Sequence, residues 1–303
     1  MAVLSHEQKD FYATNGYLVV ENAVDATQLA ALQRDFHEWI EESRAHDAPY
    51  GEIIDGRPRF DLEAGHNAER PALRRVNSPL EVSEAYFEAM SRSRMTDIAA
   101  ELVGPNTKFH HCKINSKLPG AATSVKWHQD FPFTPHTNDD LVTALLMIDD
   151  VTDDNGPLEV LPGSHRGPIQ TLWHNGKFTG AVADELARDY QAKSVRCLGS
   201  AGSVCLMHTR LLHGSAPNLS RKPRTLYICV YSAEDALPLC DNPLPSRFEG
   251  LVVRGEATGR VRTTPFEMQL PQKPKGASFF VQQAGADGMS SLAAALSPVR
   301  PTA

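Results

Sequence analysis

The sequence predicts an α+β fold in which helices pack on one face of a double-sheet jelly roll. Helical periodicity dominates residues 1–107, whereas short apolar or alternating runs separated by Gly, Pro and Asn dominate residues 108–231. Strands at this spacing are typical of antiparallel sandwiches and barrels. Helices followed by strands indicate α+β architecture. We expect one domain over residues 1–303, because no repeat or second compositional unit is visible.

The helical front opens with two capping-box patterns, in which a polar N-cap is followed three residues later by Gln: Ser5 with Gln8, and Asp25 with Gln28. The first pattern predicts a short helix that ends at Gly16, followed by a strand over 17–20. The second predicts an amphipathic helix over 26–45 with one apolar stripe facing the core. Further helices are expected from Ser78-Pro79 to Gly104-Pro105, since Pro is favoured at the first helical position.

Residues 46–77 interrupt this helical front and are rich in Gly, Pro, His and Arg. We expect a long irregular excursion here. Such loops are uncommon and often line or cover a site. A solvated surface loop remains an equal alternative. The segment concentrates positive charge in an otherwise acidic chain, at Arg57, Arg59, Arg70, Arg74 and Arg75.

The β-rich part of the chain, residues 108–231, is expected to be the catalytic core. Its strand-like runs are 108–117, 141–148, 158–161, 203–207 and 225–231. Residues 232–285 are rich in Pro and Arg and predict an irregular extension. The tail over 286–303 is small and polar and is expected to fray.

Composition excludes several classes of function. The net charge of −7 provides no basic surface for nucleic acid or an anionic membrane. The start of the chain lacks a secretory pattern, and no run approaches a membrane span. Five Cys without C-x-x-C spacing indicate reduced thiols. We therefore expect a cytoplasmic protein with a small-molecule substrate, acting as a monomer or homodimer.

His128 and Asp130 are the first candidates for chemistry. On an extended backbone, residues two apart project from the same face. With a third ligand from elsewhere they would complete the 2-His-1-carboxylate triad, which suits Fe(II) and oxygen chemistry. The pair alone is a weak signal in a chain with 12 His and 37 acidic residues.

The surrounding motifs make this signal specific. In chain order they are Trp127-His128-Gln129-Asp130, Asn155-Gly156-Pro157-Leu158, Pro162-Gly163-Ser164-His165, His213-Gly214-Ser215, and Arg224 eleven residues after His213. This ordered set resembles the phytanoyl-CoA dioxygenase family, whose members are Fe(II)- and 2-oxoglutarate-dependent oxygenases on a double-stranded β-helix, a cupin-like jelly roll. The resemblance covers residues 108–231 well and the flanks loosely.

The resemblance implies that His128, Asp130 and His213 are the iron ligands and catalytic residues. It also implies that Arg224 anchors the distal carboxylate of 2-oxoglutarate, whereas Arg221 is expected at the surface. The implied reaction uses O2 to decarboxylate 2-oxoglutarate to succinate and hydroxylates an unactivated C–H bond of a small or medium organic molecule.

Finer roles follow from the ectoine hydroxylase branch of this family, which aligns without gaps from His111 to Asp130. The alignment places Lys113 at a substrate-contacting position, and Asn115 and Thr143 at or near cosubstrate-contacting positions. Strand parity agrees, because His111, Lys113 and Asn115 share one face. We expect His111 and Lys113 to contact substrate.

The segment after Asp130 departs from that branch, so ectoine is not the expected substrate. Phe131 and Phe133 are expected to form an apolar wall beside the iron. A lone inward Lys113 needs a negative partner, which predicts a substrate that is polar or anionic at one end. The alternative, nearly as well supported, is that Lys113 pairs with an internal carboxylate and the arginines of 46–77 are solvated.

Two rival functions remain open from sequence. One is a non-oxidative metalloenzyme of cupin type, an isomerase or hydrolase using Zn or Mn; the spacing of Arg224 disfavours it. The other is a non-catalytic binding protein on the same fold, which the intact triad disfavours. The chain has no Gly-x-Ser-x-Gly, phosphate-loop or Gly-x-Gly-x-x-Gly motif, which argues against hydrolases of that type, kinases and dinucleotide enzymes.

Overall fold

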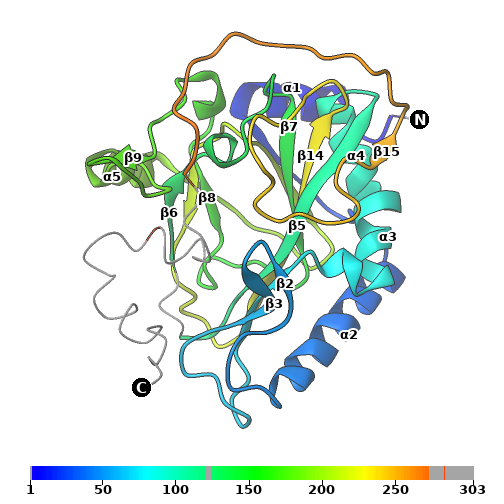
Figure 1. Ribbon diagram of the computed structural model, residues 1–303, viewed down its shortest axis with the longest axis vertical. Helices are drawn as coiled ribbons and strands as arrows, with labels where there is room; N and C mark the ends of the chain where they lie inside the picture. The colour runs from blue at the N-terminus through cyan, green and yellow to red at the C-terminus, as the bar shows by residue number, and fades with distance from the viewer. Residues whose placement is uncertain (1, 121–123, 273–282, 284–303) are drawn as a thin grey trace, which may run out of the picture.

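The structure is a computed structural model that describes residues 2–120, 124–272 and 283 (Figure 1). The tail predicted over 286–303 lies outside these described residues. The α-helices are α1 (His6–Asn15), α2 (Ala26–Ser43), α3 (Glu84–Arg92), α4 (Arg94–Val103) and α5 (Asp184–Lys193). Three 3₁₀ helices cover Pro79–Glu81, Phe131–Phe133 and Ser164–Arg166.

Both predicted capping boxes are present. The side chains of Ser5 and Asp25 each accept the backbone N–H of the Gln three residues later, and each Gln reaches back to the cap. Gly16 ends α1 with φ at 79°, a conformation that Gly adopts without strain. The predicted helix starts were therefore correct because capping depends on residues close in sequence.

The larger of the two main sheets is antiparallel, in the order β1-β12-β7-β14-β5-β4-β3-β2, with β15 pairing beside β5. We call it the major sheet. Its strands are β1 (Tyr17–Val20), β2 (Tyr50–Ile54), β3 (Arg57–Leu62), β4 (Leu73–Asn77), β5 (Thr107–Lys117), β7 (Leu141–Met147), β12 (Val204–His208), β14 (Arg224–Ala233) and β15 (Val252–Arg254).

A smaller sheet, here the minor sheet, has the order β11-β8-β13-β6. Its strands are β6 (Val125–His128), β8 (Leu158–Val160), β11 (Val195–Cys197) and β13 (His213–Ser215); β9 (Trp173–His174) and β10 (Lys177–Phe178) form a separate ribbon. Two antiparallel sheets with helices on one side confirm the predicted α+β jelly roll.

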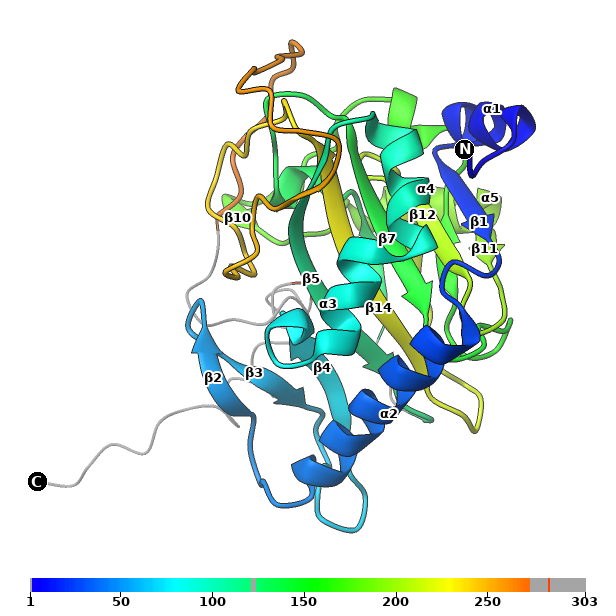
Figure 2. The same cartoon turned by 90° about the vertical axis from the view of Figure 1, so that its right-hand side faces the viewer.

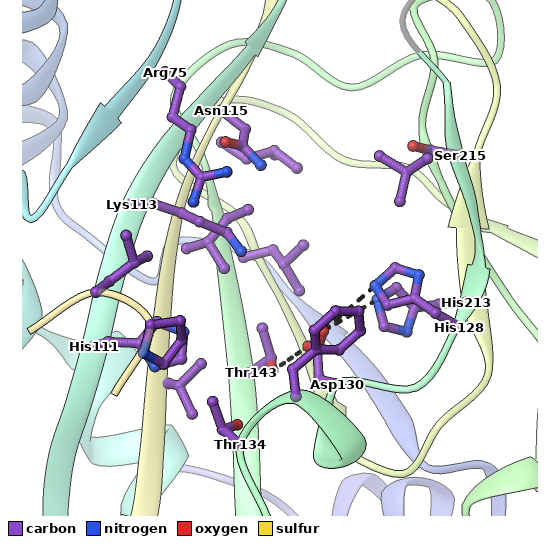
Figure 3. A pocket seen from close by; sticks show the side chains of 18 of the residues that line it. Arg75, His111, Lys113, Asn115, His128, Asp130, Thr134, Thr143, His213 and Ser215 are labelled. Carbon is purple, nitrogen blue, oxygen red and sulfur yellow. Dashed lines mark hydrogen bonds and ion pairs between the residues drawn. The ribbon is translucent and has the colours of Figure 1, made fainter. Parts of the chain in front are cut away.

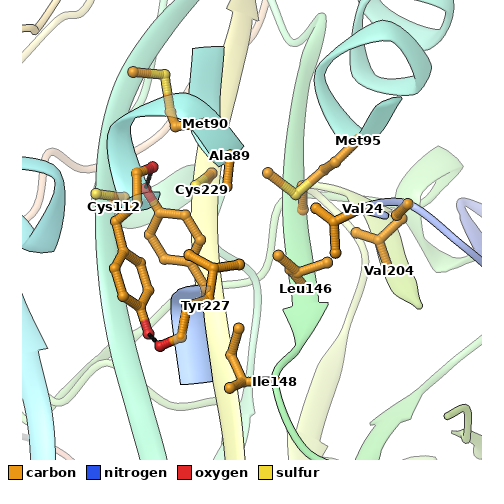
Figure 4. Packing of buried hydrophobic residues seen from close by; sticks show 14 of the residues in the cluster. Val24, Ala89, Met90, Met95, Cys112, Leu146, Ile148, Val204, Tyr227 and Cys229 are labelled. Atoms are coloured by element: carbon orange, nitrogen blue, oxygen red, sulfur yellow. Dashed lines mark hydrogen bonds between the residues drawn. The ribbon is translucent and has the colours of Figure 1, made fainter. Parts of the chain in front are cut away.

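Helices α2, α3 and α4 lie across one face of the major sheet (Figure 2). This face is apolar: Cys112 and Ile114 of β5 and Tyr227 of β14 belong to the largest buried cluster, together with helix residues such as Met95 (Figure 4). The predicted parity of β5 therefore holds, since its even-numbered residues 112 and 114 pack on the helices. The other face is left for the site. None of the helices within the described ranges is long and apolar enough to cross a membrane.

The expectation of an irregular excursion over 46–77 is wrong. Strands β2, β3 and β4 extend the major sheet, and β4 pairs with β5 so that Arg75 lies opposite Asn115. Gly56, Gly65 and Pro71 lie in the connecting segments, whereas Gly51 and Pro58 lie within β2 and β3. Asp55-Gly56, with φ of 49° and 78°, is the hairpin turn between β2 and β3, and Asp-Gly is a known hairpin signal.

Candidate active site

A cavity of about 470 Å³ opens between the two sheets. Its walls come from β4, β5, β7 and β14 of the major sheet, from β6 and β13 of the minor sheet, and from the hairpin around Gly56. Figure 3 shows polar side chains projecting into it from both sides. The site therefore lies on the sheet face opposite the helices.

His128, Asp130 and His213 converge at one end of this cavity (Figure 3). His128 ends β6 and pairs directly with His213 at the start of β13, so their imidazole centroids are 4.1 Å apart. One possible ligand atom from each residue lies within 4.8 Å of the others. The Nε2 atoms of His128 and His213 lie 3.5 Å and 3.7 Å from Asp130 Oδ1. Within the described ranges, no other group of three or more His, Cys, Asp or Glu meets the same test for a metal site.

Hydrogen bonds orient all three side chains. Nδ1 of His128 lies 2.7 Å from the Lys126 carbonyl, and Nδ1 of His213 lies 2.9 Å from the Leu211 carbonyl. A carbonyl only accepts, so each Nδ1 carries a proton, and Nε2 is the ring atom left to bind a metal. Thr143 Oγ1 donates to Asp130 Oδ2 at 2.7 Å, which leaves Oδ1 facing the imidazoles.

The protonation states suit a cation. Burial, reinforced by the neighbouring His128, lowers the pKa of His213 to about 4, so its imidazole is neutral at neutral pH. Burial alone would raise the pKa of Asp130. His213, His128 and Lys113 outweigh that effect and hold the pKa of Asp130 well below its usual range. The cluster thus presents the Nε2 atoms of two imidazoles and one carboxylate.

A second polar cluster contains Arg224, Lys117 and Ser215, which all line the cavity. Arg224 is buried at the start of β14; its Nη2 donates to the Gly156 carbonyl at 2.7 Å, and its Nε has no hydrogen-bond partner within the described residues. Lys117 Nζ donates to Ser215 Oγ at 2.7 Å. Burial lowers the pKa of Arg224 to about 10, and burial together with the charge of Arg224 lowers that of Lys117 to about 6. The buried guanidinium of Arg224, with an unused donor, and the adjacent amine of Lys117 form a receptor for a carboxylate.

The packing at this cluster explains why the Asn-Gly-Pro-Leu motif has Gly at position 156. Gly156 has φ at +75°, and a Cβ at this position would lie 2.6 Å from the Ala216 carbonyl oxygen and 3.0 Å from Lys117 Cδ. Only Gly lets the loop approach closely enough for its carbonyl to accept from Arg224.

The cavity face of β5 carries His111, Lys113 and Asn115, as strand parity predicted. His111 is buried, and its Nδ1 lies 2.6 Å from His110 Nδ1. Burial keeps the pKa of His111 well below its usual value, so this ring is neutral. Asn115 Oδ1 is buried, and no described residue forms a hydrogen bond with it. Arg75 of β4 joins this wall from the neighbouring strand (Figure 3).

One expected contact needs correction. Phe133 lines the cavity, but Phe131 packs away from it in a buried cluster with Leu141, Val230 and Phe266. Residues 131–133 form a 3₁₀ helix, in which positions two apart do not share a face as they would in a strand. Thr143, expected at or near a cosubstrate contact, lines the cavity and uses its hydroxyl to orient Asp130.

Sequence reasoning missed two residues of this site. Lys117 continues the inward series of alternate residues on β5, and Ser215 lies two residues after His213 on β13, so parity alone would have found both. Arg75 was expected only as one of five arginines of 46–77 and was not singled out, because its place depends on the pairing of β4 with β5.

Comparison with known proteins agrees with this geometry. The family model described as phytanoyl-CoA dioxygenase (PhyH) matches residues 12–226. The chain belongs to the phytanoyl-CoA dioxygenase family. It is 31% identical over 271 residues to a probable alpha-ketoglutarate-dependent hypophosphite dioxygenase of Stutzerimonas stutzeri, covering 88% of this chain and 91% of that protein. Alpha-ketoglutarate is another name for 2-oxoglutarate.

Two further proteins are also similar to this chain. L-proline trans-4-hydroxylase of Streptomyces griseoviridis is 30% identical over 196 residues, covering 58% of this chain and 72% of the relative. The crystal structure of EctD from S. alaskensis with 2-oxoglutarate and 5-hydroxyectoine has a TM-score of 0.64 and 23% identity, and the match covers 87% of this chain and 89% of that one. This structural match supports the fold.

Family membership settles the class of activity. The protein is an iron- and 2-oxoglutarate-dependent dioxygenase, an oxidoreductase that uses O2 and acts on small molecules. The oxygenase interpretation of the sequence is thereby confirmed over the isomerase, hydrolase and binding-protein alternatives.

Proposed function

We propose that His128, Asp130 and His213 hold Fe(II) and that the enzyme hydroxylates a C–H bond of a small anionic molecule. The observation that carries the proposal is the convergence of these three ligand atoms within 4.8 Å of one another. Two imidazoles and one carboxylate are the donor set of non-haem Fe(II) oxygenases. Their tautomers and orientation are fixed by the hydrogen bonds to Lys126, Leu211 and Thr143.

In this proposal the distal carboxylate of 2-oxoglutarate binds Arg224, with Lys117 and Ser215 as further partners. The free Nε of Arg224 supports this role, because a buried guanidinium donor without a partner is costly until a ligand accepts from it. Asn115, the next inward residue on β5, is proposed to contact the same cosubstrate, as the sequence predicted.

Iron with 2-oxoglutarate supplies the oxidising power, because decarboxylation to succinate provides two of the electrons needed to reduce O2. The protein supplies placement and exclusion of water. Apolar side chains of β14, Leu226, Ile228 and Val230, together with Phe133, line the cavity. They present an apolar wall against which a C–H bond can be held.

The lining charges support an anionic substrate. Cavity residues include six cations, Arg57, Arg74, Arg75, Lys113, Lys117 and Arg224, but only two carboxylates, Asp55 and Asp130. Two of the relatives point the same way: hypophosphite is an oxyanion, and proline carries a carboxylate. His111 and Phe133, with Lys113, are proposed substrate contacts.

Anaerobic titration of the protein with Fe(II) and then 2-oxoglutarate tests the metal and cosubstrate assignments. We expect a weak visible charge-transfer band that His128→Ala abolishes and His37→Ala, at an exposed residue of α2, leaves intact. Succinate formation is then measured across a panel of small anions that includes hypophosphite, proline and short carboxylates. Absence of the band from the wild-type protein would refute the assignment.

The oligomeric state, the cellular location and the absence of macromolecular partners are also proposals. We propose a monomer or homodimer in the reducing cytoplasm, without nucleic-acid or membrane partners. All five Cys are free thiols, four of them buried, and the net charge is −7. Size-exclusion chromatography with light scattering measures the oligomeric state directly.

A further inference from the structure

Arg75 is buried in the cavity wall without a counter-charge. Its side chain is 4% exposed, and its Nε donates to Asn77 Oδ1 at 2.8 Å. Its Nη1 has no hydrogen-bond partner, and no carboxylate within the described ranges lies within 4.0 Å of the guanidinium. Burial, reinforced by the charge of Arg57, lowers the pKa of Arg75 to about 9, so the group is still cationic at neutral pH. A buried charge in this state is costly until an anion binds to it.

Two neighbouring arginines on β3 and β4, unlike Arg75, form ion pairs with carboxylates. Arg74, the adjacent residue, pairs with Asp61 at 2.9 Å. Arg59, also buried, pairs with Glu81 at 2.9 Å and contacts Glu52. The fold therefore provides carboxylates for the arginines that support structure and leaves Arg75 open towards the cavity.

Lys113 adds a second positive charge beside Arg75. The two residues lie on paired strands, since Arg75 is opposite Asn115 and Asn77 is opposite Lys113. Figure 3 shows both side chains extending into the cavity from this wall. Burial, and then the repulsion from Arg75, lowers the pKa of Lys113 to about 8. Two cations that repel each other across a cavity are stabilised together when one anion binds to both.

The remaining charges of the cavity are already assigned. Asp130 belongs to the iron ligands, and Arg224 with Lys117 faces the cosubstrate in the proposal above. Asp55 belongs to the hairpin turn; burial lowers the pKa of Arg57, and the charge of Asp55 partly offsets that effect. The positive charge of Arg75 and Lys113 is therefore in excess of what iron and 2-oxoglutarate require.

We propose that Arg75 is the specificity-determining residue of this enzyme and, with Lys113, binds a compact oxyanion of the substrate, a carboxylate or phosphonate group. The inference rests on the proposed function, because it takes the metal and cosubstrate positions from it. The anion lies against the wall formed by β4 and β5, and the bond to be oxidised lies at the other end of the molecule, beside Phe133 and the triad. Neutral analogues of the same shape are rejected because they leave the buried charge of Arg75 without a counter-charge.

The test is anaerobic titration of the Fe(II)- and 2-oxoglutarate-loaded enzyme with three probes of similar size: propionate, ethylphosphonate and neutral propionamide. Binding is followed by calorimetry and by the change in the charge-transfer band. We expect the anions to bind at least 10-fold more tightly than propionamide. The ratio of propionate to ethylphosphonate affinity distinguishes the two oxyanion classes.

Three variants make the test specific to Arg75. Arg75→Gln removes the charge and should weaken anion binding roughly 10- to 100-fold, the effect of losing a charge-assisted hydrogen bond, while propionamide binding is unchanged. Arg75→Lys should lie between it and the wild type. Arg70→Gln, at an exposed residue of the same segment, is the matched control and should have no effect.

The outcomes separate the inference from the function on which it rests. If wild-type enzyme lacks the charge-transfer band, the proposed function fails. If the band and the 2-oxoglutarate affinity of Arg75→Gln are normal but anions bind as well as in wild type, the inference fails alone. It also fails if Arg75→Gln loses 2-oxoglutarate affinity, because Arg75 then serves the cosubstrate. Should Arg75→Gln not fold, Arg75→Lys and Lys113→Met decide by the same criteria.

Discussion

The two faces of the major sheet differ in whether their buried polar groups have hydrogen-bond partners. On the helix face, the hydroxyls of Tyr227 and Tyr231 each donate to a carbonyl of α3, at 3.0 Å from Tyr86 O and 2.7 Å from Met90 O (Figure 4). On the cavity face, Arg75 Nη1 and Asn115 Oδ1 (Figure 3) have no partner within the described residues, and neither has Arg224 Nε. Buried polar groups are normally satisfied. These three unsatisfied atoms line one cavity, which supports its role as a ligand site, whereas the tyrosine hydroxyls stabilise the packing of α3 on the sheet.

The largest effect is expected at the triad, on the cavity side. Asp130→Ala removes the only carboxylate of the ligand set and should abolish turnover and iron occupancy. Because the change also removes a buried charge, the melting temperature of the metal-free protein should not fall. Metal analysis, succinate formation and thermal unfolding measure the three quantities. Substantial turnover by this variant would contradict the assignment of the ligands.

On the helix face, a substitution is expected to lower stability and to leave cosubstrate binding unchanged. Ile114→Ala, next to Lys113 on β5, leaves a cavity in the fully buried cluster and should lower the free energy of unfolding by about 2–5 kcal/mol. The Michaelis constant for 2-oxoglutarate should stay the same. Denaturant unfolding and steady-state kinetics together check this. A changed Michaelis constant with unchanged stability would show that the two faces are not functionally separate.

A smaller effect, on affinity for 2-oxoglutarate, is expected from substitution of Arg224 and not of Arg221. Arg224→Lys keeps the charge but loses the planar fork, so affinity for 2-oxoglutarate should fall by about 1–3 kcal/mol. Arg221→Lys, at an exposed position in the preceding loop, is the matched control and should have no effect. Calorimetric titration of both variants measures the difference, and a larger loss for Arg221→Lys would reverse the assignment.

The smallest effect concerns a proton on Lys117. With a pKa of about 6, Lys117 is mostly neutral in the free protein at pH 7. A bound carboxylate stabilises its charged form and raises that pKa, so binding takes up a fraction of one proton and becomes tighter as pH falls from about 8 to about 6. Calorimetry in two buffers with different ionisation enthalpies measures the uptake. Lys117→Met should abolish it, and an unchanged uptake in that variant would place the proton elsewhere.

Local patterns predicted the parts of this molecule that depend on local geometry. The capping boxes, the alternation along β5 and the pair His128 and Asp130 all follow from residues at most four apart. The sequence also indicated Arg224 through its motif. Contacts between distant segments were not predicted: β4 lies beside β5 only through long-range pairing, and that pairing brings Arg75 to the cavity. Phe131 was misplaced because a single 3₁₀ turn interrupts the alternation.

The hairpin strands β2, β3 and β4 are contiguous in the chain and attach at one edge of the β5–β14–β7–β12 array. They contribute Arg75, whereas the proposed iron ligands and Arg224 come from residues 128–224. Arg75, the residue proposed to determine specificity, thus lies in a different stretch of the chain from the proposed iron ligands. Exchange of residues 50–77 between relatives is therefore a route by which evolution, or an engineer, can give the same oxidising centre a new substrate.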